Sequence, residues 1–185
     1  MAEYYLISQL PSLDGLSENS PLPIDEERFL ELCGRFLGKK AKSELEKLTL
    51  VPSRENEESE SPLVKAWNEG ERNLRIALSK VRADKMKKSV EIGNVSLPTQ
   101  LVKTASAAVE FESPLEAEMF LLRYRLSFLE TLRPMDSFSE DFIFYYGLKL
   151  KLILRIKQFD EENGKAEYKN IYNSILSGDR LEDIL

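Results

Sequence analysis

Apolar residues recur along most of this chain at intervals of three and four positions, which is the period of an α-helix. The first clear case follows Asp25, a good N-cap residue, and two glutamates that suit the positive first turn of a helix. The residues on its apolar face are Phe29, Leu32, Cys33 and Phe36. This pattern predicts a helix that Gly38 ends, followed by a shorter second helix over 40–50.

Three more helices are predicted between residues 63 and 132. The first of these helices has an apolar stripe that consists of Leu63, Trp67, Leu74, Leu78 and Val81. Its end is basic, with Lys80, Arg82, Lys85, Lys87 and Lys88. The helix dipole explains these cations, and a binding patch for an acidic partner is the alternative. Pro98 suits the first turn of a short helix through 109, and Ser113-Pro114 signals the start of one that reaches 132. That last helix is expected to bury Ala117, Phe120, Leu121, Tyr124, Phe128 and Leu132.

The segment 142–156 fits two patterns. Apolar residues occupy every even position, as in a half-buried strand, but a strand of this length would run about 50 Å, far beyond the usual size. Leu, Lys and Arg favour helices, and Ser137 or Ser139 provides an N-cap before two acidic residues. We therefore predict a helix, and because it is apolar nearly all round, we expect it at the centre of the fold.

After this helix, Asn163-Gly164 predicts a turn into a last helix that ends at Gly178. The side chains expected to point inward are Tyr168, Ile171, Tyr172, Ile175 and Leu176. At the other end of the chain, the aromatic and apolar segment 4–9 begins almost at the first residue. We expect it to be buried, as one short N-terminal strand.

The acidic and serine-rich segment 52–62 has no apolar residue and predicts an exposed, mobile linker. We interpret it as the connection between an N-terminal helical pair and the main bundle. The elements together predict an all-α fold: an irregular bundle of six or seven helices that forms a single domain over 1–185.

Composition narrows the class of protein. The chain has 185 residues, of which 42% are apolar and 31% charged, as in a soluble globular domain. Its net charge of -6 argues against nucleic acid as the main partner. No signal peptide and no apolar stretch of about twenty residues is present, which indicates a cytoplasmic protein without a membrane span. Cys33 is the single cysteine, and on an apolar helix face it is expected to be buried and inert.

The sequence contains no histidine, so it lacks both the commonest general base near neutral pH and the commonest metal ligand. It also lacks a phosphate-binding glycine loop, a metal-ligand spacing and a nucleophile elbow. Carboxylate pairs occur, but among 32 acidic residues chance pairs are expected. We predict a protein that is not an enzyme, has no cofactor and no metal, and functions by contact. An enzyme that uses two carboxylates is the least favoured alternative.

Several segments resemble a known family. Tyr4-Tyr5-Leu6-Ile7-Ser8-Gln9-Leu10-Pro11, Phe29-Leu30-Glu31-Leu32-Cys33, Tyr146-Gly147-Leu148-Lys149-Leu150 and 155–164 are similar to an uncharacterised bacterial family encoded among the subunits of V-type ATPases. That family is thought similar to the C-type component of the ATPase, called d in eukaryotes, an all-helical, funnel-shaped protein that sits on the membrane rotor ring and receives the foot of the central shaft. The resemblance covers the first 37 and the last 70 residues. The C-type component usually has three related helical units, and this chain has room for fewer.

The resemblance implies a non-catalytic subunit or accessory protein that couples the central shaft to the rotor ring during proton or sodium ion transport. The implied partners are the central-stalk and rotor-ring subunits, and the implied location is the cytoplasmic side of the membrane. The runner-up is a free-standing helical adaptor unrelated to ATPases. As candidate partner contacts we select the cations on or beside apolar helices, which are Arg123, Arg125, Lys149, Lys151 and Arg155. Surface solubility is the alternative explanation for each.

Overall fold

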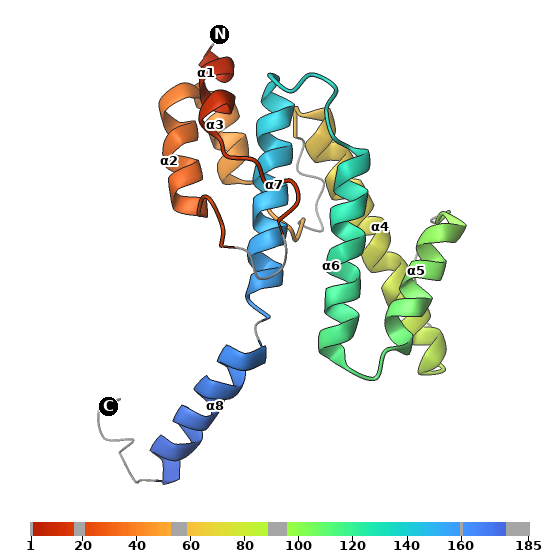
Figure 1. Cartoon of the computed structure of the whole chain (residues 1–185). Coiled ribbons are helices and arrows are strands. Elements are labelled where there is room, and N and C mark those ends of the chain that lie inside the picture. Colours follow the sequence, from red (N-terminus) through yellow and green to blue (C-terminus); the bar gives the residue numbers. More distant parts are fainter. Residues whose placement is uncertain (1, 17–20, 53–58, 89–95, 160, 177–185) are drawn as a thin grey trace, which may run out of the picture.

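The computed structural model describes residues 2–16, 21–52, 59–88, 96–159 and 161–176. Within these ranges the chain forms eight α-helices and no strand (Figure 1), which confirms the all-α prediction. The helices are α1 (Ala2–Gln9), α2 (Glu26–Phe36), α3 (Lys39–Glu46), α4 (Pro62–Lys85), α5 (Thr99–Glu110), α6 (Pro114–Thr131), α7 (Glu140–Lys157) and α8 (Glu161–Leu176). None of the described helices is both long enough and apolar enough to cross a bilayer.

Side-chain caps fix where several helices begin. The Asp25 carboxylate accepts from the Arg28 amide at 2.7 Å at the start of α2. Serine hydroxyls cap the three longest helices of the bundle in the same way, and these are Ser61 at α4, Ser113 at α6 and Ser139 at α7. The predicted starts at 25 and 113 are confirmed, and segment 142–156 is helical as predicted.

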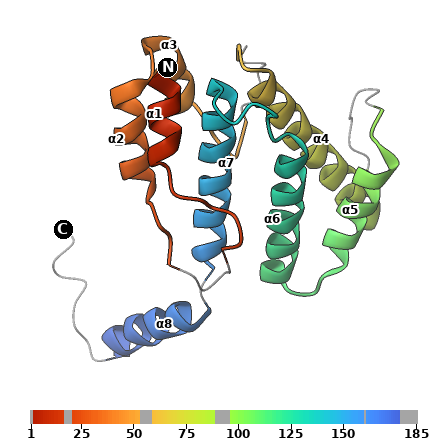
Figure 2. The ribbon, with the colours of Figure 1, turned by 45° about the horizontal axis from the view of Figure 1, so that its top comes forward.

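Helix α7 lies at the centre of the molecule (Figures 1 and 2), as expected from its apolar sequence. Every residue from Ile143 to Leu150 is buried, and α7 packs against α2, α3, α4 and α6. Gly147 allows the closest approach: a Cβ atom there would lie 3.1 Å from Leu48 and 3.2 Å from Phe29. A side chain at this position would therefore push α2 and the segment that follows α3 away from α7.

The buried apolar side chains form two clusters. The first surrounds α7 and contains residues from before and after the predicted linker, such as Leu45 and Trp67. The second joins the last half of α4 to α5 and the first half of α6, and it consists of Leu74, Ala77, Leu78, Leu101, Ala105, Ala108 and Leu121. The N-terminal helices therefore share a core with the main bundle. Of the predicted linker 52–62, residues 53–58 lie outside the described part, and its flanking residues Pro52 and Ser61 are buried.

The N-terminal segment differs from the sequence prediction, because residues 4–9 belong to helix α1 and not to a strand. A lone strand would leave its backbone N–H and C=O groups without hydrogen-bond partners, whereas a helix pairs these groups with one another. Leu6 is fully buried, but Tyr4 and Tyr5 are 54% and 60% exposed, so only one side of the segment enters the core. This helix also raises the number of described helices above the expected six or seven.

The last helix differs as well. Asn163 and Gly164 lie inside α8 and not in a turn before it. Figure 1 shows α8 running away from the body of the molecule beyond the end of α7. Tyr168, Ile171 and Tyr172, which were expected to point inward, are 68%, 58% and 51% exposed. The amphipathic pattern identified the apolar face correctly, but this face is not covered by the core. The side chains of 175 and 176, and all of Gly178, lie outside the described part.

Candidate functional site

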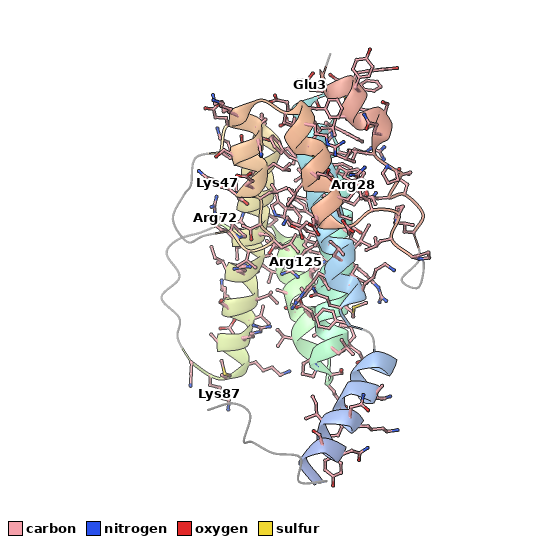
Figure 3. All side chains as sticks on the ribbon, turned by 90° about the vertical axis from the view of Figure 1, so that its left-hand side faces the viewer. Glu3, Arg28, Lys47, Arg72, Lys87 and Arg125 are labelled. Atoms are coloured by element: carbon pink, nitrogen blue, oxygen red, sulfur yellow. The ribbon has the colours of Figure 1, made fainter. Side chains whose placement is uncertain are left out.

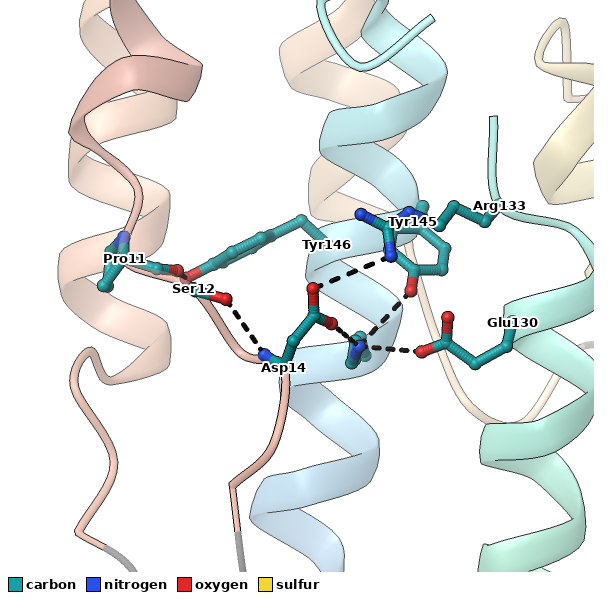
Figure 4. A network of polar contacts seen from close by, with 8 residues as sticks. Pro11, Ser12, Asp14, Glu130, Arg133, Tyr145 and Tyr146 are labelled. Carbon is teal, nitrogen blue, oxygen red and sulfur yellow. Dashed lines mark hydrogen bonds and ion pairs between the residues drawn. The ribbon is translucent and has the colours of Figure 1, made fainter. Parts of the chain in front are cut away.

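A network of charged side chains surrounds Lys149, which is buried in the middle of α7 (Figure 4). Its ammonium group donates to Asp14 Oδ1 at 2.5 Å and lies 2.7 Å from Glu130 Oε1. Arg133 Nη1 lies 3.6 Å from the other oxygen of Asp14, and the Tyr145 hydroxyl accepts from Lys149 at 3.4 Å. The network therefore connects the loop after α1 and the end of α6 to the central helix.

These contacts keep Lys149 protonated. Burial would lower the pKa of Lys149, but hydrogen bonds to Asp14 and Glu130 outweigh burial and raise the pKa above its ordinary value. The hydrogen bond from Lys149 lowers the pKa of Asp14. Burial would raise the pKa of Glu130, but the hydrogen bonds from Lys149 and Tyr145 and the positive charge of Lys149 together outweigh it, and the pKa is lowered. A lysine must be neutral to act as a nucleophile. This geometry therefore favours a structural role for Lys149, as the centre of an ion-pair network, over a catalytic one.

A second charged pair lies inside the bundle between α4 and α6. Arg125 Nε donates to Glu71 Oε1 at 2.6 Å, and the two side chains are only 13% and 3% exposed. Glu71 Oε2 has no hydrogen-bond partner among the described residues, although Arg75 Nε lies 3.7 Å from it. In Figure 3, Arg125 lies between the helices, whereas Lys87 lies at the outer end of α4. Arg125 is therefore engaged within its own chain.

The other candidate contacts have different surroundings. Lys151 forms an ion pair with Glu26 at the start of α2. Arg155 is exposed near the end of α7, with its guanidinium 4.8 Å from the centre of the Phe159 ring. Arg123 is exposed on α6. At least three of the five selected cations, which are Arg125, Lys149 and Lys151, thus form ion pairs within the chain itself, and partner contact through any of the five stays a prediction.

One of these ion pairs has a signal in the sequence. Glu71 lies four residues after Trp67 and three before Leu74, on the same predicted stripe of α4. An acidic residue at a core position indicates a buried partner of opposite charge, which the structure supplies as Arg125. Asp14 and Glu130 have no comparable signal, because neither shares a helix face with Lys149.

Two groups stand out among the exposed apolar side chains of the described surface, which also include Val51, Met86, Phe111 and Leu115. The first, which we call the α1 aromatic cluster, consists of Tyr4 and Tyr5 of α1 with Met135 and Phe138 from the turn between α6 and α7. The rings of Tyr4 and Phe138 are 4.8 Å apart, and Met135 is fully exposed. The second, which we call the α8 face, consists of Tyr168, Ile171 and Tyr172. The two groups lie at opposite ends of the molecule (Figures 1 and 2).

A groove of about 780 Å³ lies between α3 and α4. Its cations include Lys39, Lys47 and Arg72, the last two of which lie on the same side of the molecule in Figure 3. The charge of the groove is mixed, however, because Glu44 and Glu60 also line it. Glu60 forms an ion pair with Lys40 at 2.5 Å. The groove therefore has no single sign of charge that would select one class of ligand.

The basic end of α4 also has a local explanation. Lys80, Arg82, Lys85, Lys87 and Lys88 are all exposed. Lys85 donates to the carbonyl oxygen of Val109 at 2.8 Å, which caps the last turn of α5. At least one of these cations therefore stabilises the packing of α4 on α5.

The side chains that commonly carry chemistry are sparse in the described residues. No group of three or more His, Cys, Asp or Glu side chains in this part of the chain is arranged to hold a metal ion. Cys33 is fully buried, as expected, and burial raises the pKa of its thiol to about 12. Comparisons of the chain with models of known protein families, with curated proteins and with solved structures found no match.

Proposed function

We propose that this protein is a non-catalytic subunit or accessory protein of a V-type ATPase, and that it couples the central shaft to the membrane rotor ring. The observation that carries the proposal is the pair of exposed apolar surfaces at opposite ends of the molecule, the α1 aromatic cluster and the α8 face. A protein that transmits force between two partners needs two separate contact surfaces. Exposed aromatic side chains are typical anchors of such contacts.

A coupling protein also needs a stiff body between its contact surfaces. Helix α7 spans 18 residues, or about 27 Å, and runs between the two ends. It is held by a packed core on several sides and by the Lys149 network, which fastens the N-terminal loop and α6 to it. The resemblance of the chain to a family encoded with V-type ATPases supplies the identity of the proposed partners.

Co-purification tests this proposal. The tagged protein is expressed in its own organism, and the ATPase is extracted from membranes in a mild detergent. We expect central-stalk subunits to be recovered with the tagged protein, and the isolated protein to have no ATPase activity. Recovery of no ATPase component, from an extract in which the intact complex is demonstrated, would rule the proposal out.

A free-standing adaptor is the second candidate, and one observation favours it. The basic end of α4 presents five exposed cations on a chain whose net charge is -6. Such a local concentration of positive charge can steer an acidic protein partner to this end of the molecule. Reversing the charge of Lys80 and Lys88 would weaken an adaptor contact of this kind, while ATPase recovery would be unaffected.

A further inference from the structure

The groove between α3 and the first half of α4 is large enough to hold a small molecule. Its volume of about 780 Å³ lies within the range of known ligand sites, which runs from about 300 to about 1,000 Å³. Three of its lining residues are buried and apolar, and these are Leu48, Pro52 and Val64. Ser43 of α3 and Asn68 of α4 add polar groups to the lining. An apolar floor with a few polar groups is typical of a small-molecule site.

The cations of the groove come from both helices. Lys40 of α3 pairs with Glu60 just before α4, so the two helices begin at the same end of the groove. Lys47 of α3 and Arg72 of α4 lie toward the other end, on the same side of the molecule (Figure 3). Lys39 lies about 12 Å before Lys47 along α3, because each helical residue adds about 1.5 Å. One small anion can therefore contact Lys47 and Arg72 together, but not Lys39 as well.

The charge of the groove is mixed when all lining side chains are counted, but it is not balanced. Four cations and two carboxylates line the groove, which leaves an excess of two positive charges. Both carboxylates already have partners within the chain. Glu60 is neutralised by its ion pair with Lys40. Glu44 Oε1 accepts from the Ser61 amide at 3.3 Å and from the Ser59 hydroxyl, which fixes this carboxylate on the residues before α4.

The remaining cations of the groove have no such partners. Within the described ranges, no hydrogen bond or ion pair engages the side chains of Lys39, Lys47 or Arg72. Arg72 is the informative one of the three, because it is partly buried and charged groups withdrawn from water are usually paired. Arg125 and Lys149, which are also withdrawn from water, each bind a carboxylate of the chain. Arg72 is therefore placed to bind an anion that enters the groove.

We propose that this groove is a binding site for a small, soluble organic phosphate, whose phosphoryl group contacts Lys47 and Arg72. A phosphate monoester has a charge of about −1.5 to −2 near pH 7, which matches the positive excess of the groove. The planar guanidinium of Arg72 can donate two hydrogen bonds to a phosphate, and the Lys47 ammonium adds a point charge. The organic part of the ligand packs on the apolar floor. The site does not depend on the ATPase as a partner.

The test measures binding of glycerol 3-phosphate to the full-length protein by isothermal titration calorimetry. The site variant carries Lys47→Gln and Arg72→Gln, which keep good helix propensity. The matched control carries Lys65→Gln and Lys103→Gln, which remove two exposed cations outside the groove and so change the net charge equally. The melting temperature verifies that both variants fold.

A local signal accompanies the calorimetry. Trp67 is the single tryptophan, and its indole N–H donates to the carbonyl oxygen of Thr49, which lines the groove. Its fluorescence should therefore change when the groove is filled and stay unchanged when phosphate binds elsewhere.

We expect the site variant to bind glycerol 3-phosphate at least about 30-fold more weakly, because two charge-assisted contacts are lost. The control should bind like the natural protein. Lys39→Gln should weaken binding by less than about 3-fold, since Lys39 acts only at a distance. Equal binding by the site variant and the natural protein would overturn the inference. So would the lack of any calorimetric or fluorescence signal at about 10 mM glycerol 3-phosphate.

Three comparisons separate the other possible occupants. Citrate has carboxylates and no phosphate, so equally tight binding of citrate would show that the groove selects charge alone and would overturn the inference. Vesicles that contain phosphatidic acid present the same phosphate chemistry on a lipid, and we expect no binding to them. Vesicle binding that requires Lys47 and Arg72, without binding of the soluble probe, would assign the groove to lipid and overturn the inference.

The third comparison concerns the chain itself. The sequence between Pro52 and Ser59, which both line the groove, contains Glu55, Glu57 and Glu58 outside the described residues. We expect a variant with glutamine at these three positions to bind glycerol 3-phosphate like the natural protein. Phosphate binding that appears only in this variant would assign the cations of the groove to that segment and overturn the inference. None of these results bears on the recovery of ATPase subunits, so the two proposals fail separately.

Discussion

Glu71 and Arg125 are both withdrawn from water, so removing either one leaves a charge in the interior without its partner. Loss of one member of a buried ion pair usually costs about 3–5 kcal/mol. Arg75, which lies 3.7 Å from the second oxygen of Glu71, compensates in part. The same ion pair contributes much less to the net stability of the protein than this loss suggests, because both charges had to be dehydrated.

We therefore predict that Arg125→Met lowers the free energy of unfolding by about 3 kcal/mol, as measured by urea denaturation. Replacing both residues, with Glu71→Leu and Arg125→Met, should recover most of this loss. Lys65→Met on the exposed side of α4 is the control and should change stability by less than about 0.5 kcal/mol. An Arg125→Met protein as stable as the natural one would mean that the pair is not buried in solution.

The Lys149 network gives the stability of the protein a defined pH dependence. Asp14 and Glu130 have lowered pKa values in the folded protein, so their contribution is present above their ordinary pKa of about 4. It is lost as the pH falls through the folded pKa values, because the unfolded chain then binds more protons. The raised pKa of Lys149 acts at the alkaline limit: its contribution is present below 10.5 and is lost as the pH rises through the folded value.

Unfolding free energies measured from pH 7 to pH 2.5 should accordingly fall for the natural protein below about pH 4. The slope should be shallower in Lys149→Met, since the two carboxylates then have no cation at the centre of the network. The effect is modest, because the Asp14 and Glu130 side chains are 57% and 42% exposed. Parallel curves for the two proteins would show that the network does not control acid stability.

At the scale of helices, the two core clusters differ in how completely they enclose aromatic side chains. Trp67 of α4 is fully buried in the first cluster, where its ring stacks on Phe128 and its indole N–H donates to the carbonyl oxygen of Thr49. Phe120 of α6 is only partly buried against the second cluster. The sequence periodicity alone predicted that both residues are buried in the core.

Trp67→Ala should cost about 3–5 kcal/mol in denaturant melts, because it leaves a large cavity beside α7. Phe120→Ala should cost less, about 1–2 kcal/mol, because less apolar area is lost. A loss below about 1 kcal/mol for Trp67→Ala would contradict its placement in the core.

The helices were predictable where their causes are local. Caps at Asp25, Ser113 and Ser139 involve residues three positions apart, so the sequence shows them directly. Contacts between distant segments were not predictable in this way, since Lys149 and Asp14 are 135 positions apart. For α8, periodicity identifies the apolar face, but it contains no information about whether another part of the chain covers that face.

At the scale of the whole molecule, the body and α8 should be separable. The described α8 side chains are exposed, whereas the body has its own two-cluster core. We predict that a chain ending at Phe159 melts within about 3 °C of the full chain, a shift that corresponds to less than about 1 kcal/mol in a protein of this size. Scanning calorimetry measures this, and a lower melting temperature by 10 °C or more would show that α8 packs on the body.

The attachment of the N-terminal loop has a consequence for synthesis of the chain. Tyr146 donates to the Pro11 carbonyl oxygen at 2.8 Å, and Lys149 binds Asp14. The loop therefore cannot form these contacts until residues 135 positions further along the chain have been synthesised. At about 5–20 residues per second, a ribosome needs roughly 7–27 s to supply them. The cluster between residues 74 and 121 is complete before then. The contacts between this loop and α7 can therefore form only after the second cluster has been synthesised.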